Sequence, residues 1–97
     1  MNYYKVGMNY ELHMVYIPYH NNEKGICMNL LLVEDDLNLG KILKRQMEDH
    51  GITVTLCTTG KQGTELIYSG ADIDIMVLDW MLPDMSGLDI LNQLYFD

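Results

Sequence analysis

The chain is short of basic side chains. It carries 6 Lys and Arg residues against 14 Asp and Glu residues, which gives a formal net charge of −8 over 97 residues. The excess lies in residues 28–97, because Lys5 and Lys24 balance Glu11 and Glu23 in the first part of the chain. Nucleic-acid binding needs clustered Lys and Arg side chains that neutralise phosphates. We therefore expect no direct nucleic-acid binding by this chain.

Cysteines and long apolar runs are also scarce. Cys27 and Cys57 are the 2 cysteines, and their spacing fits neither a metal motif nor a disulfide framework, as is usual in a reducing compartment. No apolar run approaches the roughly 20 residues of a membrane span. The N-terminus lacks the basic and apolar regions of a signal peptide. We expect a cytoplasmic protein of one domain without a membrane partner.

Two short apolar runs, each ending in acidic residues, are the main positive feature. The first reads LLLVEDD over residues 30–36, and the second reads IMVLD over residues 75–79, followed by WMLPDMSG. Short apolar runs bounded by turn signals are typical of buried parallel strands. Strands are expected near residues 28–34, 52–57 and 73–79, with helix-sized segments between them. The pattern therefore predicts an α/β fold.

The acidic ends of these runs form a candidate site. In open α/β sheets, sites form where the carboxyl ends of neighbouring strands meet, which would bring Glu34, Asp35 and Asp79 together. Three carboxylates in one place repel one another unless a cation lies among them. Oxygen ligands without Cys or His favour Mg²⁺ over Zn²⁺. We therefore interpret the site as a magnesium site in a phosphoryl-accepting switch.

Each acidic motif also has an ordinary structural interpretation. Glu34, Asp35 and Asp36 would suit the N-terminus of the next helix, where carboxylates interact favourably with the helix dipole. Asp79, with a Pro and a Gly downstream, would suit a simple strand-to-helix turn. The combination favours a site, because both motifs follow strands at equivalent positions.

Three helices are expected around these strands. Apolar positions 39, 42, 43 and 47 form one face of a helix that ends at Gly51. Thr58 or Thr59 is expected to cap a helix over residues 61–69. Ser86 is expected to cap the last helix, whose positions 88 and 91 would face inward. The two aspartates before the third strand, at positions 72 and 74, are expected to be solvated loop charges.

From residue 28 to the C-terminus the chain resembles the receiver domain of bacterial two-component response regulators. The sequence DWMLP at residues 79–83 is frequent in the transcription-factor subfamily that has a winged-helix output. The resemblance implies a flavodoxin-like, doubly wound parallel sheet. This chain would hold the first three strand–helix units, with strand order 2-1-3.

The resemblance also implies roles for individual residues. Asp79 falls on the phosphoacceptor, Asp35 on the direct Mg²⁺ ligand, and Glu34 on a ligand that acts through water. Met81 falls where the family supplies a backbone carbonyl to the metal. The implied donor is the phosphohistidine of a sensor histidine kinase, with small phosphodonors as another source. The chain would then be a phosphoacceptor that assists its own phosphorylation rather than an enzyme.

The chain is expected to be a truncated receiver. It stops at Asp97, within the third of the family's five strand–helix units. The family's later units carry a Ser or Thr and a Lys that contact the phosphoryl group, and neither can be assigned here. A 2-1-3 order would also leave the strand at 73–79 at an edge, where a long apolar strand invites pairing with other chains. Self-association through that edge is therefore expected.

Residues 1–27 lie outside the resemblance. We expect an N-terminal extension that is not part of the domain, which would comprise residues 28–97. Apolar residues at positions 10, 12, 14 and 16 alternate with Glu11 and His13 before Val15 and Ile17 break the pattern, which predicts a strand that Pro18 ends.

Two other functional classes remain. One is an inactive receiver-like fragment that only binds a partner or has no function, which the unassigned Ser/Thr and Lys favour. The other is a Mg²⁺-dependent hydrolase or nuclease of the haloacid dehalogenase or toprim type. Those proteins place a second acid two residues after the strand-end Asp, where this chain has Met81, which cannot act as a general acid. The phosphoacceptor interpretation is therefore favoured.

Overall fold

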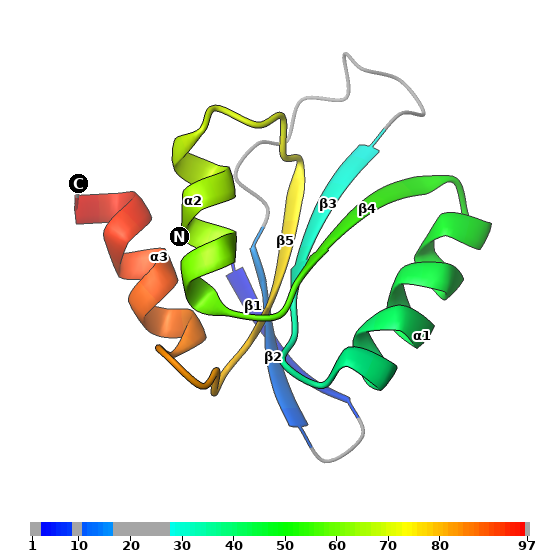
Figure 1. Ribbon diagram of the computed structural model, residues 1–97, viewed down its shortest axis with the longest axis horizontal. Coiled ribbons are helices and arrows are strands. Elements are labelled where there is room, and N and C mark those ends of the chain that lie inside the picture. The colour runs from blue at the N-terminus through cyan, green and yellow to red at the C-terminus, as the bar shows by residue number, and fades with distance from the viewer. Residues whose placement is uncertain (1–2, 9–10, 17–27, 97) are drawn as a thin grey trace.

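The computed structural model describes residues 3–8, 11–16 and 28–96, with side chains described for residues 28–93. A five-stranded sheet lies at the centre, in the order β1-β2-β5-β3-β4 (Figure 1). The strands are β1 (Tyr3–Met8), β2 (Glu11–Tyr16), β3 (Met28–Val33), β4 (Ile52–Cys57) and β5 (Ile75–Asp79). The helices are α1 (Leu37–Asp49), α2 (Gly60–Tyr68) and α3 (Gly87–Phe96).

The parallel part of the sheet has the expected topology. Strand β3 pairs in parallel with β4 on one side and with β5 on the other. In the numbering of the parallel strands alone this is the order 2-1-3, so the predicted partial flavodoxin-like arrangement is confirmed. Leu32 stands level with Leu56 in β4 and with Val77 in β5.

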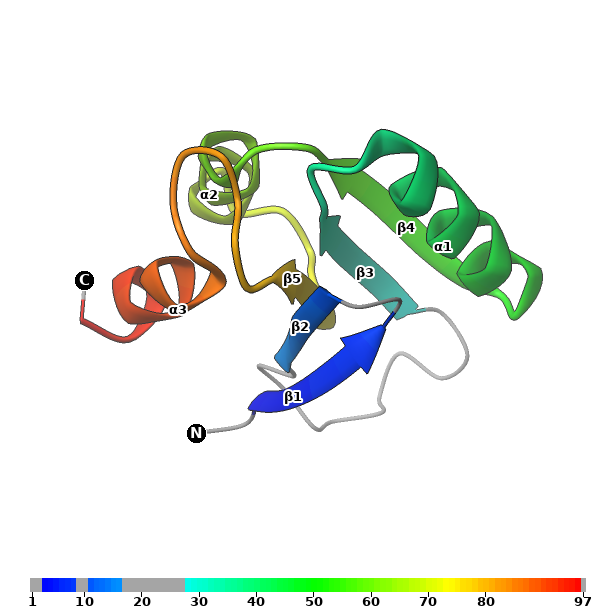
Figure 2. The ribbon, with the colours of Figure 1, turned by 90° about the horizontal axis from the view of Figure 1, so that it is seen from below.

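Helices cover both faces of the parallel strands, which explains why β3 and β5 are apolar on both faces, with Asn29 and Asp79 as the polar exceptions. Helix α1 lies on one face, and α2 and α3 lie on the other (Figures 1 and 2). Leu31 and Val33 pack with residues of α3 such as Ile90. Leu30 and Leu32 point the opposite way, because side chains alternate along a strand, and belong to the core under α1.

Each helix begins at the kind of capping residue that satisfies the free N–H groups of a first turn. Asp36 accepts a hydrogen bond from Leu39 N–H at 3.1 Å, and Thr59 accepts one from Gln62 N–H at 3.1 Å. Ser86 caps α3, as predicted. None of the helices in the described part of the chain has the length and apolar character needed to span a bilayer.

The expectation that β5 would lie at an edge of the sheet is wrong. Strand β2 pairs antiparallel with β5, in a register that sets Val15 opposite Val77, and β1 pairs antiparallel with β2. The strand predicted near residues 10–16 is therefore present. It pairs with β5, the strand that was expected to have an open edge. Residues 17–27, which join β2 to β3, and Tyr10 lie outside the described residues. The assignment of residues 28–97 as the domain stays a proposal; β1 and β2 lie in the same sheet, outside the three parallel strands.

Substitution of Val15 by Pro is expected to promote self-association. β2 lies between β1 and β5, so that a proline in it removes one N–H from the sheet and weakens the pairing that covers β5. An uncovered apolar strand pairs with other chains. Sedimentation velocity over a range of protein concentrations should detect a larger associated fraction in Val15→Pro than in the wild type. Val15→Thr keeps the N–H and the branched side chain and should behave as wild type; identical sedimentation of all three would contradict the prediction.

Candidate metal centre

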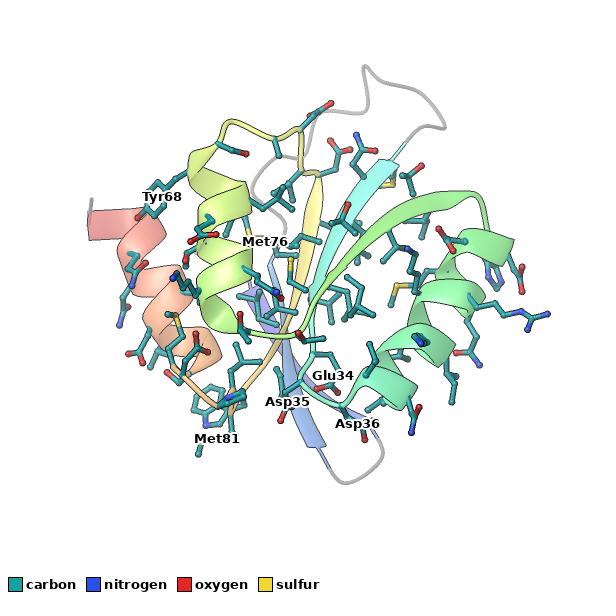
Figure 3. All side chains as sticks on the ribbon, viewed as in Figure 1. Glu34, Asp35, Asp36, Tyr68, Met76 and Met81 are labelled. Carbon is teal, nitrogen blue, oxygen red and sulfur yellow. The ribbon has the colours of Figure 1, made fainter. Side chains whose placement is uncertain are left out.

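The carboxyl ends of β3 and β5 lie side by side. The parallel register sets Val33 level with Leu78, and the next residue in each strand direction is acidic: Glu34 after β3 and Asp79 at the end of β5. Glu34 N–H donates a hydrogen bond to Cys57 O at 2.9 Å, which continues the pairing of β3 and β4 past the last strand residue. The site is thus fixed by sheet pairing, and Figure 3 shows Glu34 and Asp35 at the same end of the sheet as Met81.

Glu34, Asp35 and Asp79 form a compact group of carboxylates. One oxygen from each lies within 4.8 Å of the others. Glu34 is fully buried and Asp79 is 4% exposed, whereas Asp35 is exposed to solvent. Glu34 Oε2 also accepts a hydrogen bond of 3.5 Å from Asp36 N–H. Two of the three carboxylates are thus buried, and the third reaches the surface.

The donor set fits a hard divalent cation. All three side chains offer oxygen, and their negative charges, held within 4.8 Å of one another, are mutually repulsive at close range. Magnesium prefers a few carboxylate oxygens and keeps several of its waters. An exposed ligand beside buried ones leaves room for those waters. The arrangement therefore suits Mg²⁺ better than zinc, which favours Cys and His.

The loop between β5 and α3 closes over the same end of the sheet. Met81 N–H donates to Asp79 Oδ1 at 3.3 Å, and Met81 and Ser86 form an isolated antiparallel bridge. Leu82 N–H donates to Met85 O at 3.0 Å, and Gly87 N–H donates to Trp80 O at 3.0 Å. These bonds hold the backbone of Met81 beside Asp79, while its side chain is 69% exposed.

One residue of this loop was not singled out from the sequence. Asp84 accepts hydrogen bonds from Gly60 N–H and Lys61 N–H, both at 2.8 Å, at the start of α2. Desolvation of the Asp84 carboxylate acts to raise its pKa, but these backbone bonds outweigh it and hold the pKa below its ordinary value. The partners lie 23 and 24 residues away, so that no local pattern could have indicated the contact.

Comparison with known proteins identifies the class. Residues 30–96 match the family model described as the response regulator receiver domain. The match covers more than half of the chain, and the chain belongs to this family. It includes all three clustered carboxylates and the loop that carries Met81 and Asp84.

Among curated proteins, the chain is similar to several named response regulators. The transcriptional regulatory protein QseB of Escherichia coli O157:H7 is 42% identical over 66 residues, which are 68% of this chain and 30% of QseB. The response regulator SaeR of Staphylococcus epidermidis is 41% identical over 66 residues, which are 68% of this chain and 28% of SaeR. The transcriptional regulatory protein CusR of Escherichia coli K12 is 40% identical over 67 residues, 69% of this chain and 29% of CusR. The chain thus spans less than a third of the length of these relatives, which their names describe as regulators.

The structure brings together the residues that the sequence singled out. Glu34, Asp35 and Asp79 share one group, and the backbone of Met81 is bonded to Asp79. Asp36 belongs instead to α1, whose N-cap it forms. The individual roles of these residues in metal binding and phosphorylation stay predictions.

Proposed function

We propose that this chain is the phosphoacceptor module of a two-component response regulator, and that Asp79 accepts a phosphoryl group from a sensor histidine kinase. The observation that carries the proposal is the convergence of Glu34, Asp35 and Asp79 at two adjacent strand ends, in a chain of the receiver family. The names of QseB and CusR extend the proposal to a role in transcriptional regulation within a longer protein. The reaction would take place in the cytoplasm.

The chemistry follows from the carboxylate of Asp79. One of its oxygens attacks the phosphorus atom of the donor, a bond to phosphorus forms, and the bond between phosphorus and the donor nitrogen breaks. The product on the chain is a mixed anhydride. Magnesium held by Asp35, Asp79 and the carbonyl of Met81 would offset the negative charge of the phosphoryl oxygens. Glu34, which is buried beside them, would hold a water of the metal.

The loop bonds support this assignment of roles. Met81 N–H is directed to Asp79 Oδ1. Leu82 N–H, which shares a peptide with the Met81 carbonyl, donates to Met85 O, so that the peptides on both sides of Met81 are held by hydrogen bonds. A carboxylate and a carbonyl that are already in place lose little freedom when they bind a metal or a phosphoryl group. The phosphorylated carboxylate would add negative charge at the loop, which is the kind of change that biases a two-state domain.

Phosphorylation by a small acyl phosphate tests the proposal. The purified chain is incubated with the donor and Mg²⁺, and its intact mass is measured. The expected result is a gain of one phosphoryl group, and no gain when a chelator has removed the metal before the donor is added. A chain that gains no mass with the acyl phosphate, and none with a phosphorylated sensor kinase domain, would instead fit the interaction-only class.

Asp35→Asn is expected to weaken Mg²⁺ binding more than Glu34→Gln. Both substitutions remove one charge and keep the side-chain shape, but only Asp35 is proposed to touch the ion directly. We expect a loss of affinity of up to about tenfold to a hundredfold for Glu34→Gln, as for a residue that acts on the metal through water, and a larger loss for Asp35→Asn. Isothermal titration calorimetry gives the affinities, and the emission of Trp80, which is partly buried against the core, gives an independent signal. Equal losses in the two variants would contradict the assignment.

A further inference from the structure

The first turn of α2 is capped by two residues from different parts of the chain. A helix begins with N–H groups that have no partner within the helix and must be satisfied from outside. Thr59 accepts from Gln62 N–H through its side chain, and its carbonyl accepts the first i→i−4 bond of the helix, from Gly63 N–H. Two further donors of the first turn, Gly60 N–H and Lys61 N–H, are both satisfied by Asp84. One cap is therefore local, and the other comes from the loop of the metal site.

The contact between the loop and α2 is also sterically close. Gly60 is buried, and a methyl group placed on it would lie 2.7 Å from Sδ of Met85 and 3.1 Å from Oδ1 of Asp84. A real Cβ at those distances would displace its neighbours. The absence of a side chain at residue 60 thus lets the loop approach until both oxygens of Asp84 reach the backbone.

The same carboxylate lies close to the proposed metal ligand along the chain. Met81 precedes Asp84 by three residues, and the bond from Leu82 N–H to Met85 O closes a tight turn around Asp84. The chain has little freedom within this turn. When the Asp84 carboxylate is bonded to the first N–H groups of α2, the backbone of Met81 is therefore held in place as well. Two charge-assisted hydrogen bonds of 2.8 Å are stronger than ordinary ones.

We propose that Asp84 is a positioning residue for the metal centre: by binding the N-terminus of α2 it holds the β5–α3 loop, and with it the backbone of Met81, whose N–H donates to Asp79 Oδ1. The inference rests on the proposed function for the identity of the metal, Mg²⁺. The loop contact itself is independent of that function. In this proposal Asp84 supports the metal centre by holding the loop, without contacting the ion itself.

Two cap deletions on the same helix separate this role from helix stability. Asp84→Ala removes the cap that comes from the loop, and Thr59→Ala removes the local cap and leaves the loop bonds intact. Both should loosen the first turn of α2 to a similar degree. Only Asp84→Ala is expected to lower the affinity for Mg²⁺, by about tenfold, and to speed amide hydrogen exchange at Leu82 and Gly87. Asp84→Asn keeps one acceptor oxygen and should restore part of both properties.

The outcomes distinguish the inference from the function on which it rests. If wild type binds Mg²⁺ and Asp84→Ala binds it equally well, or if Thr59→Ala loses as much affinity as Asp84→Ala, the positioning role is refuted while the proposed function stands. If wild type binds no Mg²⁺, the proposed function fails. Amide exchange then decides alone whether Asp84 holds the loop: faster exchange at Leu82 and Gly87 in Asp84→Ala supports it, and unchanged exchange overturns it.

Discussion

Asp79→Asn is expected to abolish covalent phosphorylation of the chain. The amide of Asn has nearly the shape of the carboxylate but is not a competent nucleophile toward phosphorus. Its oxygen can still accept the hydrogen bond from Met81 N–H, which in the wild type is 3.3 Å long, so the loop should keep its position. Intact-mass measurement after incubation with an acyl phosphate and Mg²⁺ should show incorporation at the background level only. Because Asp79 lies with Glu34 and Asp35, removal of its negative charge also relieves repulsion between the carboxylates and should leave the fold at least as stable.

A matched control separates loss of the nucleophile from loss of charge. Glu48→Gln removes one carboxylate from an exposed position of α1, far along the chain from the strand ends, and should be phosphorylated like wild type. The acyl phosphate on Asp79 should also be released by hydroxylamine, as phosphoserine would not be. Incorporation at the wild-type level in Asp79→Asn would show that another residue is the phosphoacceptor.

The site was predictable because its signals are local. An apolar run marks each strand, the side chains of β3 and β5 alternate between two cores, and the acidic residues come at fixed places relative to the strand ends. Parallel pairing then brings Glu34 beside Asp79 without further information. The caps at Thr59 and Ser86 were predictable for the same reason, since a cap bonds to residues three positions ahead.

The parts that the sequence did not predict depend on distant partners. The partial alternation that begins at Tyr10 indicated a strand, but nothing in that segment identifies β5 as its neighbour. Asp74 was expected to be a solvated loop charge, yet its Oδ2 accepts a hydrogen bond of 2.8 Å from Asn29 N–H. Asp84 is a third example, because its partners lie on α2.

Helix faces were predicted only in part. Ile42 was assigned to the inner face of α1 but is 55% exposed, and Leu88 of α3 is exposed as well. Leu91 is buried as expected, and Ile90, which was not predicted, is completely buried. Which stripe of a helix faces inward depends on how the helix sits on the sheet, and apolar spacing alone leaves more than one choice.

Gly87→Ala is expected to disrupt both stability and the metal centre. A Cβ on Gly87 would lie 2.6 Å from the carbonyl oxygen of Asp79 and 3.4 Å from Cβ of Leu78. Because the first obstacle is backbone, it cannot turn aside as a flexible side chain would, so the start of α3 must move away from the end of β5. Overpacking of this kind costs about 1–3 kcal/mol of unfolding free energy. The shift would also strain the bond from Gly87 N–H to Trp80 O and displace the peptide of Met81.

Gly70→Ala shows what a loss of stability alone would do. Gly70 has φ of 81° and open space around it, so that alanine there is penalised by its backbone conformation, by about 1–2 kcal/mol, without touching the strand ends that carry the carboxylates. Urea unfolding should therefore show lower stability in both variants. Only Gly87→Ala should also lose Mg²⁺ affinity, measured on protein that is still folded. If the two variants bind Mg²⁺ equally well, the close approach of α3 to Asp79 matters for packing alone, and the geometry of the metal centre does not depend on it.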